Sequence, residues 1–313
     1  MLLLHGVHIL VHQIYNRLFE NAIYKIGKMQ KSLRKLLNFS RFCGKIILLN
    51  HDIKKRKLMK RTLLYKFVYC IGRLAFPRAK TVRESGEPDS PGIYVCNHAG
   101  IRGPAMMTLY YERPHRTWTI SYTLDRSKCA NFAFHDFFCG ESRKHKGAWR
   151  VLSKAVGFIM PRLFASGDVI PLYHDKNVVK TVRQTLSALE NGEDVVIFAE
   201  SPVRFSEYVH ELQTGFADIG YLYHLKTGKK LKFYPVYVEK KNRAIAVASP
   251  VEYDPSVPMR EQRAAIASAV RDGIDRMARG LGEHKPVPFL PERWYKAYGK
   301  YENDLNSYWK LFE

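Results

Sequence analysis

The stretch GIYVCNHAGIRG, residues 92–103, joins a short apolar run to a loop that carries His98. Residues 93–96 are all apolar, which is typical of a strand buried on both faces of a sheet. His98 therefore stands at the carboxyl end of this predicted strand, where a histidine can act as a general base. No acidic residue follows within six positions. An acid that orients His98 would have to come from another loop, and without one His98 would be a remnant of a base.

From about residue 90 onward, apolar runs alternate with stretches of helical periodicity. This alternation predicts an α/β fold with a mixed, largely parallel central sheet covered by helices. The predicted strands are 93–96, 117–122, 169–172, 195–198, 233–238 and 244–248. The predicted helices are 145–165, 176–190, 215–226 and 259–281, and Asn191-Gly192 supplies a stop signal after the second of them.

Polar and charged side chains follow three of the predicted strands. They are Asn97-His98, then Tyr173-His174-Asp175, then the run from Glu200 to Arg204. Functional side chains of open α/β sheets gather at the carboxyl ends of the strands, where the loops converge. The sequence therefore predicts a functional site at this edge of the sheet.

The positive charge of the chain is concentrated at its N-terminal end. Residues 1–80 hold 18 of the 51 Lys and Arg residues but only two of the 29 Asp and Glu residues. A basic excess confined to one end indicates a docking segment for an anionic partner. Nucleic acid would fit the charge, but no recognition motif supports it, and no nucleic acid is expected as a partner.

Apolar residues interleaved with the basic ones favour an anionic membrane surface as that partner. The segment 61–76, RTLLYKFVYCIGRLAF, has the composition of a helix that lies in a lipid interface. The alternative is an ordinary amphipathic helix packed on its own domain. No apolar run reaches the roughly 18 residues required to cross a bilayer, so a peripheral protein on the cytoplasmic face of a membrane is expected.

These patterns divide the chain into four parts. They are a basic N-terminal appendage (1–58), an interfacial amphipathic helix (59–80), an α/β domain (81–285) and an aromatic-rich C-terminal tail (286–313). The five cysteines lack a CxxC spacing, which indicates reduced thiols in a cytosol-facing protein. No metal-binding or nucleotide-binding motif is present, so neither a metal nor a bound cofactor is predicted.

Five blocks between about residues 80 and 255 resemble, in order, the motifs of the glycerophospholipid acyltransferases, typified by 1-acylglycerol-3-phosphate acyltransferase. The blocks are NHAGIRGP (97–104), GDVIPLYHD (167–175), VVIFAESPVRFS (195–206), TGFADIGYL (214–222) and FYPVYV (233–238). Enzymes of this family move a fatty acyl group from acyl-CoA or acyl-carrier protein to a glycerolipid hydroxyl. The resemblance implies that His98 is catalytic, and it implies an acceptor- or phosphate-binding set. That set is His174, Glu200, Ser201 and Arg204.

The sequence departs from the family pattern at three places. The family's histidine is oriented by an aspartate five positions later, and Gly103 occupies that position here. The family's phosphate-binding arginine aligns with His174, which lacks a charged, bidentate fork. In the third motif Arg204 is displaced by one residue. Another acid could replace the missing aspartate. The candidates are Asp125, Asp136, Asp175 and Glu200.

The resemblance implies an O-acyltransferase of phospholipid biosynthesis or remodelling. Its partners would be an acyl donor, a lysophospholipid or related hydroxyl acceptor, and an anionic membrane surface. The departures at Gly103 and His174 leave an alternative, a catalytically degenerate membrane-associated lipid-binding protein. The partner of His98 in the folded chain separates the two interpretations.

Overall fold

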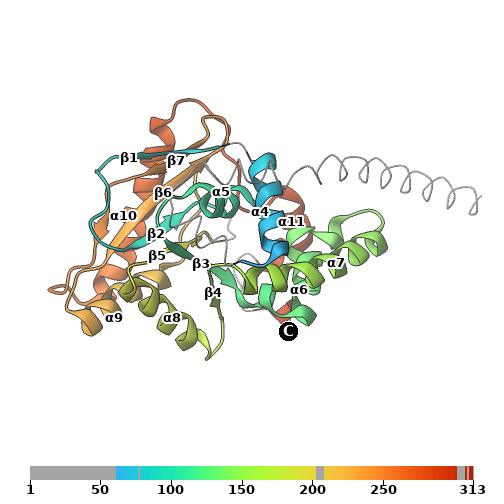
Figure 1. Cartoon of the computed structure of the whole chain (residues 1–313), viewed down its shortest axis with the longest axis horizontal. Coiled ribbons are helices and arrows are strands. Elements are labelled where there is room, and N and C mark those ends of the chain that lie inside the picture. The colour runs from blue at the N-terminus through green and yellow to red at the C-terminus, as the bar shows by residue number, and fades with distance from the viewer. Residues whose placement is uncertain (1–60, 77, 202–207, 302–306, 309, 313) are drawn as a thin grey trace, which may run out of the picture. The chain divides into compact units, whose positions relative to one another are not determined.

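The computed structural model describes residues 61–76, 78–201, 208–301, 307–308 and 310–312. All of them belong to one compact unit, Lys57–Glu313 (Figure 1). The predicted basic appendage, 1–58, lies outside the described residues. Within the described ranges, no helix has the length and apolar character required to cross a membrane.

The centre of the fold is an eight-stranded sheet with the order β1-β7-β6-β2-β5-β3-β4, and β8 pairs with β6. The neighbouring strands from β6 to β4 are parallel, whereas β7 and β8 run antiparallel to β6. This confirms the predicted mixed, largely parallel sheet. The strands are Lys80–Arg83 (β1), Ile93–Cys96 (β2), His115–Ile120 (β3), Val169–Leu172 (β4), Asp194–Ile197 (β5), Lys232–Glu239 (β6), Ala244–Val247 (β7) and Val251–Glu252 (β8).

All six strands predicted from periodicity are present, and β3 is displaced by two residues. It begins and ends two residues before the predicted 117–122, because Ser121–Leu124 winds into a 3₁₀ turn. The short strands β1 and β8 are additional. β1 pairs with β7 and β8 pairs with β6, so their place depends on distant partners rather than on local pattern.

The four predicted helices are confirmed to within about three residues, and helices α5, α6 and α11 are additional. The helices are Leu63–Ala75 (α4), Arg102–Tyr110 (α5), Arg126–Phe132 (α6), Lys146–Ala165 (α7), Val178–Glu190 (α8), Asp218–Thr227 (α9), Met259–Gly280 (α10) and Glu292–Tyr298 (α11). The predicted end of the second helix is confirmed: α8 ends at Glu190, and Gly192 follows with a φ of +75°.

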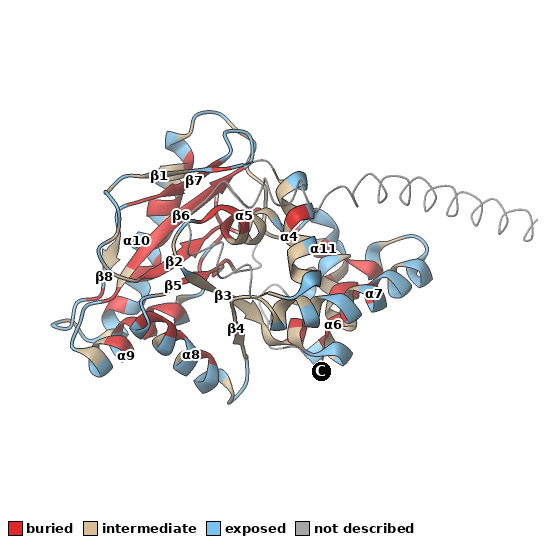
Figure 2. Cartoon of the chain, in the orientation of Figure 1, coloured by how far each residue is buried: buried red, intermediate tan, exposed pale blue. Residues whose placement is uncertain are grey.

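Helices cover both faces of the sheet, and strand β2 shows how its side chains divide between them. Ile93 and Val95 pack in a core with residues of α8, α9 and α10. Tyr94 and Cys96 point to the other face, where residues of α5 complete a second core. Because both faces are covered, β2 is fully buried (Figure 2), which explains its continuous apolar run.

The C-terminal tail packs against the segment that follows β3. Its aromatic side chains form a third cluster with Tyr122 and Cys139. Tyr308 joins this cluster through two hydrogen bonds: it accepts one from the Trp294 indole at 2.9 Å and donates one to Asp136 at 2.6 Å. The tail is therefore part of the folded unit.

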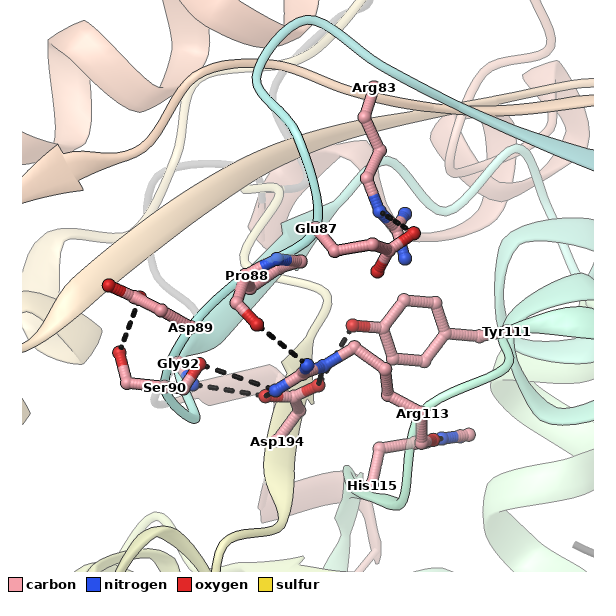
Figure 3. Close-up of polar contacts among 10 residues, drawn as sticks. All are labelled: Arg83, Glu87, Pro88, Asp89, Ser90, Gly92, Tyr111, Arg113, His115 and Asp194. Carbon is pink, nitrogen blue, oxygen red and sulfur yellow. Dashed lines mark hydrogen bonds and ion pairs between the residues drawn. The ribbon is translucent and has the colours of Figure 1, made fainter.

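A buried carboxylate joins several segments at the amino ends of the strands (Figure 3). Asp194, the first residue of β5, accepts hydrogen bonds from the Gly92 N–H at 3.1 Å, the Tyr111 hydroxyl at 2.9 Å and the Arg113 Nε at 2.7 Å. Arg113 also donates to the carbonyl oxygens of Pro88 and Ser90. The network holds β5 to the approach to β2 and to the end of α5.

We expect Asp194→Asn to lower the free energy of unfolding by about 3 kcal/mol, since it leaves the Arg113 guanidinium without its buried counter-charge. Urea unfolding followed by circular dichroism measures the change. The control is Glu190→Gln, which removes an exposed ion pair with Lys226 and should cost about 0.5 kcal/mol or less. Equal stabilities for the two variants would contradict a role for Asp194 as the link between these segments.

Candidate active site

The carboxyl ends of β2 and β5 lie side by side. The two strands are parallel neighbours, and Val95 stands opposite Ile197 in their register. His98 follows β2 by two residues, and Glu200 follows β5 by three residues. Strand pairing therefore brings together two residues that are 102 positions apart in sequence.

The turn that carries His98 is fixed to the sheet by its neighbour, Asn97. The Asn97 side chain accepts a hydrogen bond from the Val238 N–H at 2.7 Å and donates one to the Val238 carbonyl at 3.3 Å. Ala99 and Gly100 follow with φ angles of 46° and 64°, and α5 begins at Arg102. The left-handed pair turns the chain sharply, so that His98 points across the end of the sheet instead of continuing β2.

Glu200 is the carboxylate partner of His98. The His98 Nδ1 atom lies 3.4 Å from the Glu200 Oε2, and the same oxygen accepts a hydrogen bond of 2.5 Å from the His98 main-chain N–H. Nδ1 is enclosed and makes no hydrogen bond in this geometry, so a small rotation of the ring would direct it onto the carboxylate. A proton on Nδ1 leaves Nε2 as the basic nitrogen.

Residues on both sides of the segment 202–207 hold the Glu200 carboxylate. Glu200 forms an antiparallel bridge with Leu212, and the Ser201 N–H donates to the Glu211 carbonyl at 2.7 Å. The second carboxylate oxygen accepts from the His210 N–H at 3.2 Å. Both oxygens of this buried side chain therefore have donors, and its position is fixed.

The electrostatics of Glu200 favour a charged carboxylate. Burial by itself would raise the pKa of Glu200, but the nearby ring and charge of His98 and the hydrogen bond from its main-chain N–H lower it, with a smaller contribution from His210. The pKa of Glu200 lies below its ordinary value as a result. An ionised carboxylate beside an imidazole stabilises the imidazolium that forms when the ring accepts a proton.

Two phenylalanine rings enclose the imidazole of His98. Phe289, from the C-terminal tail, stacks on it with ring centroids 3.9 Å apart and planes inclined by 17°. Phe198 lies at 4.9 Å with a tilt of 44°. The Phe289 N–H also donates to the His210 Nε2 at 3.4 Å. The tail is thus bonded to the same segment that holds Glu200, and it covers a face of the ring.

Gly103 cannot carry the aspartate that the family pattern places there. A Cβ atom at this position would lie 2.3 Å from the Asn97 carbonyl oxygen and 2.6 Å from the His98 carbonyl oxygen. These contacts are with backbone, which cannot move aside as a flexible side chain would. The tight entry into α5 therefore excludes an aspartate at position 103, and the carboxylate in contact with His98 is that of Glu200.

The other three candidate acids have different contacts. Asp125 caps α6 by accepting from the Ser127 and Lys128 N–H groups, and Asp175 accepts from Asn177. Burial raises the pKa of Asp136, while its hydrogen bond from Tyr308 and the charge of His98 lower it. The net effect raises the pKa of Asp136, whose hydrogen bond joins it to Tyr308, whereas Glu200 lies in contact with His98.

The other predicted site residues are His174, Ser201 and Arg204. His174 is exposed beyond the end of β4, which is separated from β2 by β5 and β3, a span of about 14 Å. Ser201 is next to Glu200 and is half-buried. Arg204 lies outside the described residues. Of the predicted set, the structure places Glu200 in contact with His98.

His210 and Phe289 belong to the site and were not predicted from the sequence. His210 follows Glu200 by ten residues on the segment that returns to the sheet, so its place depends on how that segment folds back. Phe289 lies among many aromatic residues of the tail, and nothing in the local sequence distinguishes it from them. Only tertiary contact identifies both.

The part of the chain that the structure describes contains no set of side chains placed to bind a metal ion. No group of three or more His, Cys, Asp and Glu side chains there could hold a metal ion. Cys129 and Cys139, which flank His135 and Asp136 in the sequence, are buried free thiols. Burial raises the pKa of the Cys129 thiol to about 11 and that of the Cys139 thiol to about 12, so neither is a ready thiolate.

We expect Gly103→Ala to lower the free energy of unfolding by about 2 kcal/mol, because its methyl group would overlap two backbone carbonyls. Gly103→Asp should cost at least as much. Urea unfolding measures both. Gly147→Ala is the matched control: no atom lies within 4 Å of its Cβ, and alanine should be neutral or stabilising in α7. A Gly103→Asp protein as stable as the wild type would show that this position tolerates the family's aspartate.

Removal of the Phe289 ring should expose the imidazole of His98. We expect Phe289→Ala to increase the rate of His98 acylation by diethylpyrocarbonate several-fold, while Phe289→Tyr keeps the wild-type rate. Peptide mass spectrometry reads the modification at each histidine, and His224, on α9, serves as the internal reference. An unchanged rate at His98 would show that Phe289 does not cover the ring in solution.

Comparisons with known proteins find a distant likeness among solved structures. No protein-family model matches the chain, and no curated protein matches it. Among solved structures, the chain is similar to the 1-acyl-sn-glycerophosphate (LPA) acyltransferase PlsC from Thermotoga maritima, with 15% sequence identity and a TM-score of 0.41. The alignment covers 79% of this chain and 90% of the other.

Proposed function

We propose that this chain is an O-acyltransferase that moves a fatty acyl group from acyl-CoA or acyl-carrier protein to a lysophospholipid or related hydroxyl acceptor. Its place would be in phospholipid biosynthesis or remodelling. The observation that carries the proposal is the contact between His98 and the buried carboxylate of Glu200 at the carboxyl edge of the sheet. That pair has the composition and the position of a general base with its orienting acid.

The proposed reaction uses His98 twice. With Nδ1 protonated and facing Glu200, Nε2 accepts the proton of the acceptor hydroxyl as that oxygen attacks the thioester carbonyl. The resulting tetrahedral intermediate collapses with cleavage of the C–S bond. The departing thiolate then takes the proton from the imidazolium, so that ester and free thiol are released and His98 returns to its neutral form. The negative charge of Glu200 stabilises the imidazolium between the two steps.

Glu200 acts on the histidine in this proposal, not on the acceptor's phosphate. The resemblance implied an acceptor-binding role, but both of its carboxylate oxygens are engaged by His98 and by His210. The negative charge of the Glu200 carboxylate would also repel the negative charge of a phosphate. Phosphate binding is left to Arg204, Ser201 and His174, and Arg204 is the member of this set with a permanent charge.

Exposed apolar residues on α4 support a peripheral place on the cytoplasmic face of an anionic membrane. Leu63, Phe67, Ile71 and Leu74 are 82%, 49%, 48% and 59% exposed. At 100° per residue they lie within an arc of about 80° on the helix. The other side of α4 packs on the domain, where the Tyr69 hydroxyl donates to the Leu109 carbonyl of α5 at 3.2 Å. The helix is thus both anchored to the domain and apolar outside, as an interfacial helix requires.

The test of the proposed chemistry compares two site variants with a surface histidine variant. Full-length protein is supplied with radiolabelled acyl-CoA or acylated carrier protein and a panel of lysophospholipids. We expect His98→Ala to lower the transfer rate by roughly a thousandfold and Glu200→Gln by roughly a hundredfold or more. His224→Ala, at a histidine on α9 whose Nδ1 contacts only the nearby Lys229 carbonyl, should keep the wild-type rate.

Thermal melting of each variant separates a chemical effect from a folding effect. Transfer by His98→Ala at the wild-type rate would rule out His98 as the base. Wild-type protein that binds vesicles but transfers no acyl group with either donor would favour the alternative, a lipid-binding protein that has lost the chemistry.

A further inference from the structure

We propose that the exposed face of α7 is a second lipid-docking surface, which seats on an anionic bilayer. The sequence placed membrane contact within residues 59–80, whereas α7 belongs to the α/β domain itself. This inference rests on the proposed function, which places the protein at a membrane. Vesicle binding tests it without a measurement of acyl transfer.

The outer face of α7 is apolar along most of its length. Val151, Leu152, Phe158 and Ile159 are 68%, 44%, 53% and 41% exposed. At 100° per residue these positions fall within an arc of about 120°. Figure 2 shows exposed residues along α7, in contrast to the buried strands of the sheet. Large apolar side chains gathered on one exposed helix face mark an interaction site more often than isolated ones do.

The opposite side of α7 is buried against the domain, which fixes the orientation of the helix. Its buried residues are Ser153, Gly157 and Pro161. Gly157 permits close packing, since a Cβ there would lie 2.7 Å from the Ala130 Cβ of α6. The apolar arc therefore points away from the domain because of packing.

The charge of α7 selects an anionic partner. The helix contains Lys146, Arg150, Lys154 and Arg162 and no acidic residue. Two guanidinium groups lie beside an apolar ring of the arc: those of Arg126 and Arg162 are 5.1 Å and 3.8 Å from the centroid of the Phe158 ring. Basic side chains around an apolar face can reach lipid headgroups while the apolar residues enter the acyl boundary.

The same charges argue against a second copy of the chain as the occupant. A symmetric contact between two α7 helices would place the basic residues of one against those of the other. Glu141 contacts Lys146 and Arg150 at 2.7 Å and 3.4 Å, but it offsets only part of this charge. Each Lys or Arg near an anionic leaflet is instead attracted by about 1 kcal/mol.

The position of α7 links this surface to α4 and to the edge of the sheet that carries His98. The C-terminal end of α7 adjoins the start of α4: the Thr62 N–H donates to the Ser166 hydroxyl at 3.1 Å, and the Arg61 guanidinium contacts Ser166 and Asp168. Helices α6 and α7 follow the carboxyl end of β3, on the edge where His98 and Glu200 lie. The segment that carries α7 thus begins at the edge of the sheet where His98 lies.

The experiment measures binding of the full-length protein to vesicles by co-sedimentation. The test variant carries Val151→Ser, Leu152→Gln, Phe158→Ser and Ile159→Ser. The matched control carries Val178→Ser, Val179→Ser and Leu225→Gln, which remove exposed apolar side chains from α8 and α9. Vesicles contain phosphatidylcholine with or without about one-third phosphatidylserine.

We expect the α7 variant to lose at least about tenfold in partitioning to the anionic vesicles, because its apolar side chains no longer leave water on binding. The control should bind like the wild type. The difference should persist at about 0.5 M salt, where screening weakens attraction between the basic N-terminal segment and the vesicle. Wild-type protein should prefer the anionic vesicles.

Two outcomes would overturn the proposal. One is equal binding by the wild type and the α7 variant, with loss only in a Leu63→Gln, Phe67→Ser, Leu74→Gln variant of α4. The other is a wild-type dimer that the α7 substitutions dissociate while vesicle binding is unchanged, which would assign the face to a second copy. Transfer to a water-soluble short-chain lysolipid should be unaffected by the α7 substitutions, so failure of the docking surface and failure of the chemistry can be told apart.

Discussion

The parallel pairing of β2 with β5 is the constraint on which the candidate site depends. It places a histidine and a carboxylate that are 102 residues apart within 3.4 Å of each other at one edge of the sheet. The residues around Glu200 then hold its charge in a buried position, and a buried carboxylate interacts with its partner more strongly than an exposed one. Contacts of His98 with Phe198 and Glu200 follow from this arrangement, and the C-terminal tail adds the contact with Phe289.

The position of Gly103 shows how local packing decides which carboxylate lies beside His98. The entry into α5 is so tight that backbone oxygens occupy the space of a side chain at this position. An acid on that turn is excluded, and an acid on the neighbouring strand end has the required contact. The absence of an acid at Gly103 and the contact of His98 with Glu200 therefore belong to the same local packing.

Apolar residues outside the five motif blocks complete the site and form the proposed docking surface. Phe289 comes from a tail that is bonded to the domain through Tyr308 and Asp136. The apolar arc of α7 lies on a segment inserted between β3 and β4. Both features belong to segments that adjoin the carboxyl edge of the sheet, where His98 lies.

The sequence by itself determined the α/β class, the six main strands and the place of His98 at a strand end, because buried parallel strands leave continuous apolar runs that can be read locally. It also offered Glu200 as one of four possible partners. Only the tertiary structure selected Glu200, excluded a side chain at Gly103, and brought Phe289 and His210 to the site. Strand order and the path of the tail decide these contacts. These contacts depend on which distant segments pair, and the periodicity of a single segment does not predict such pairing.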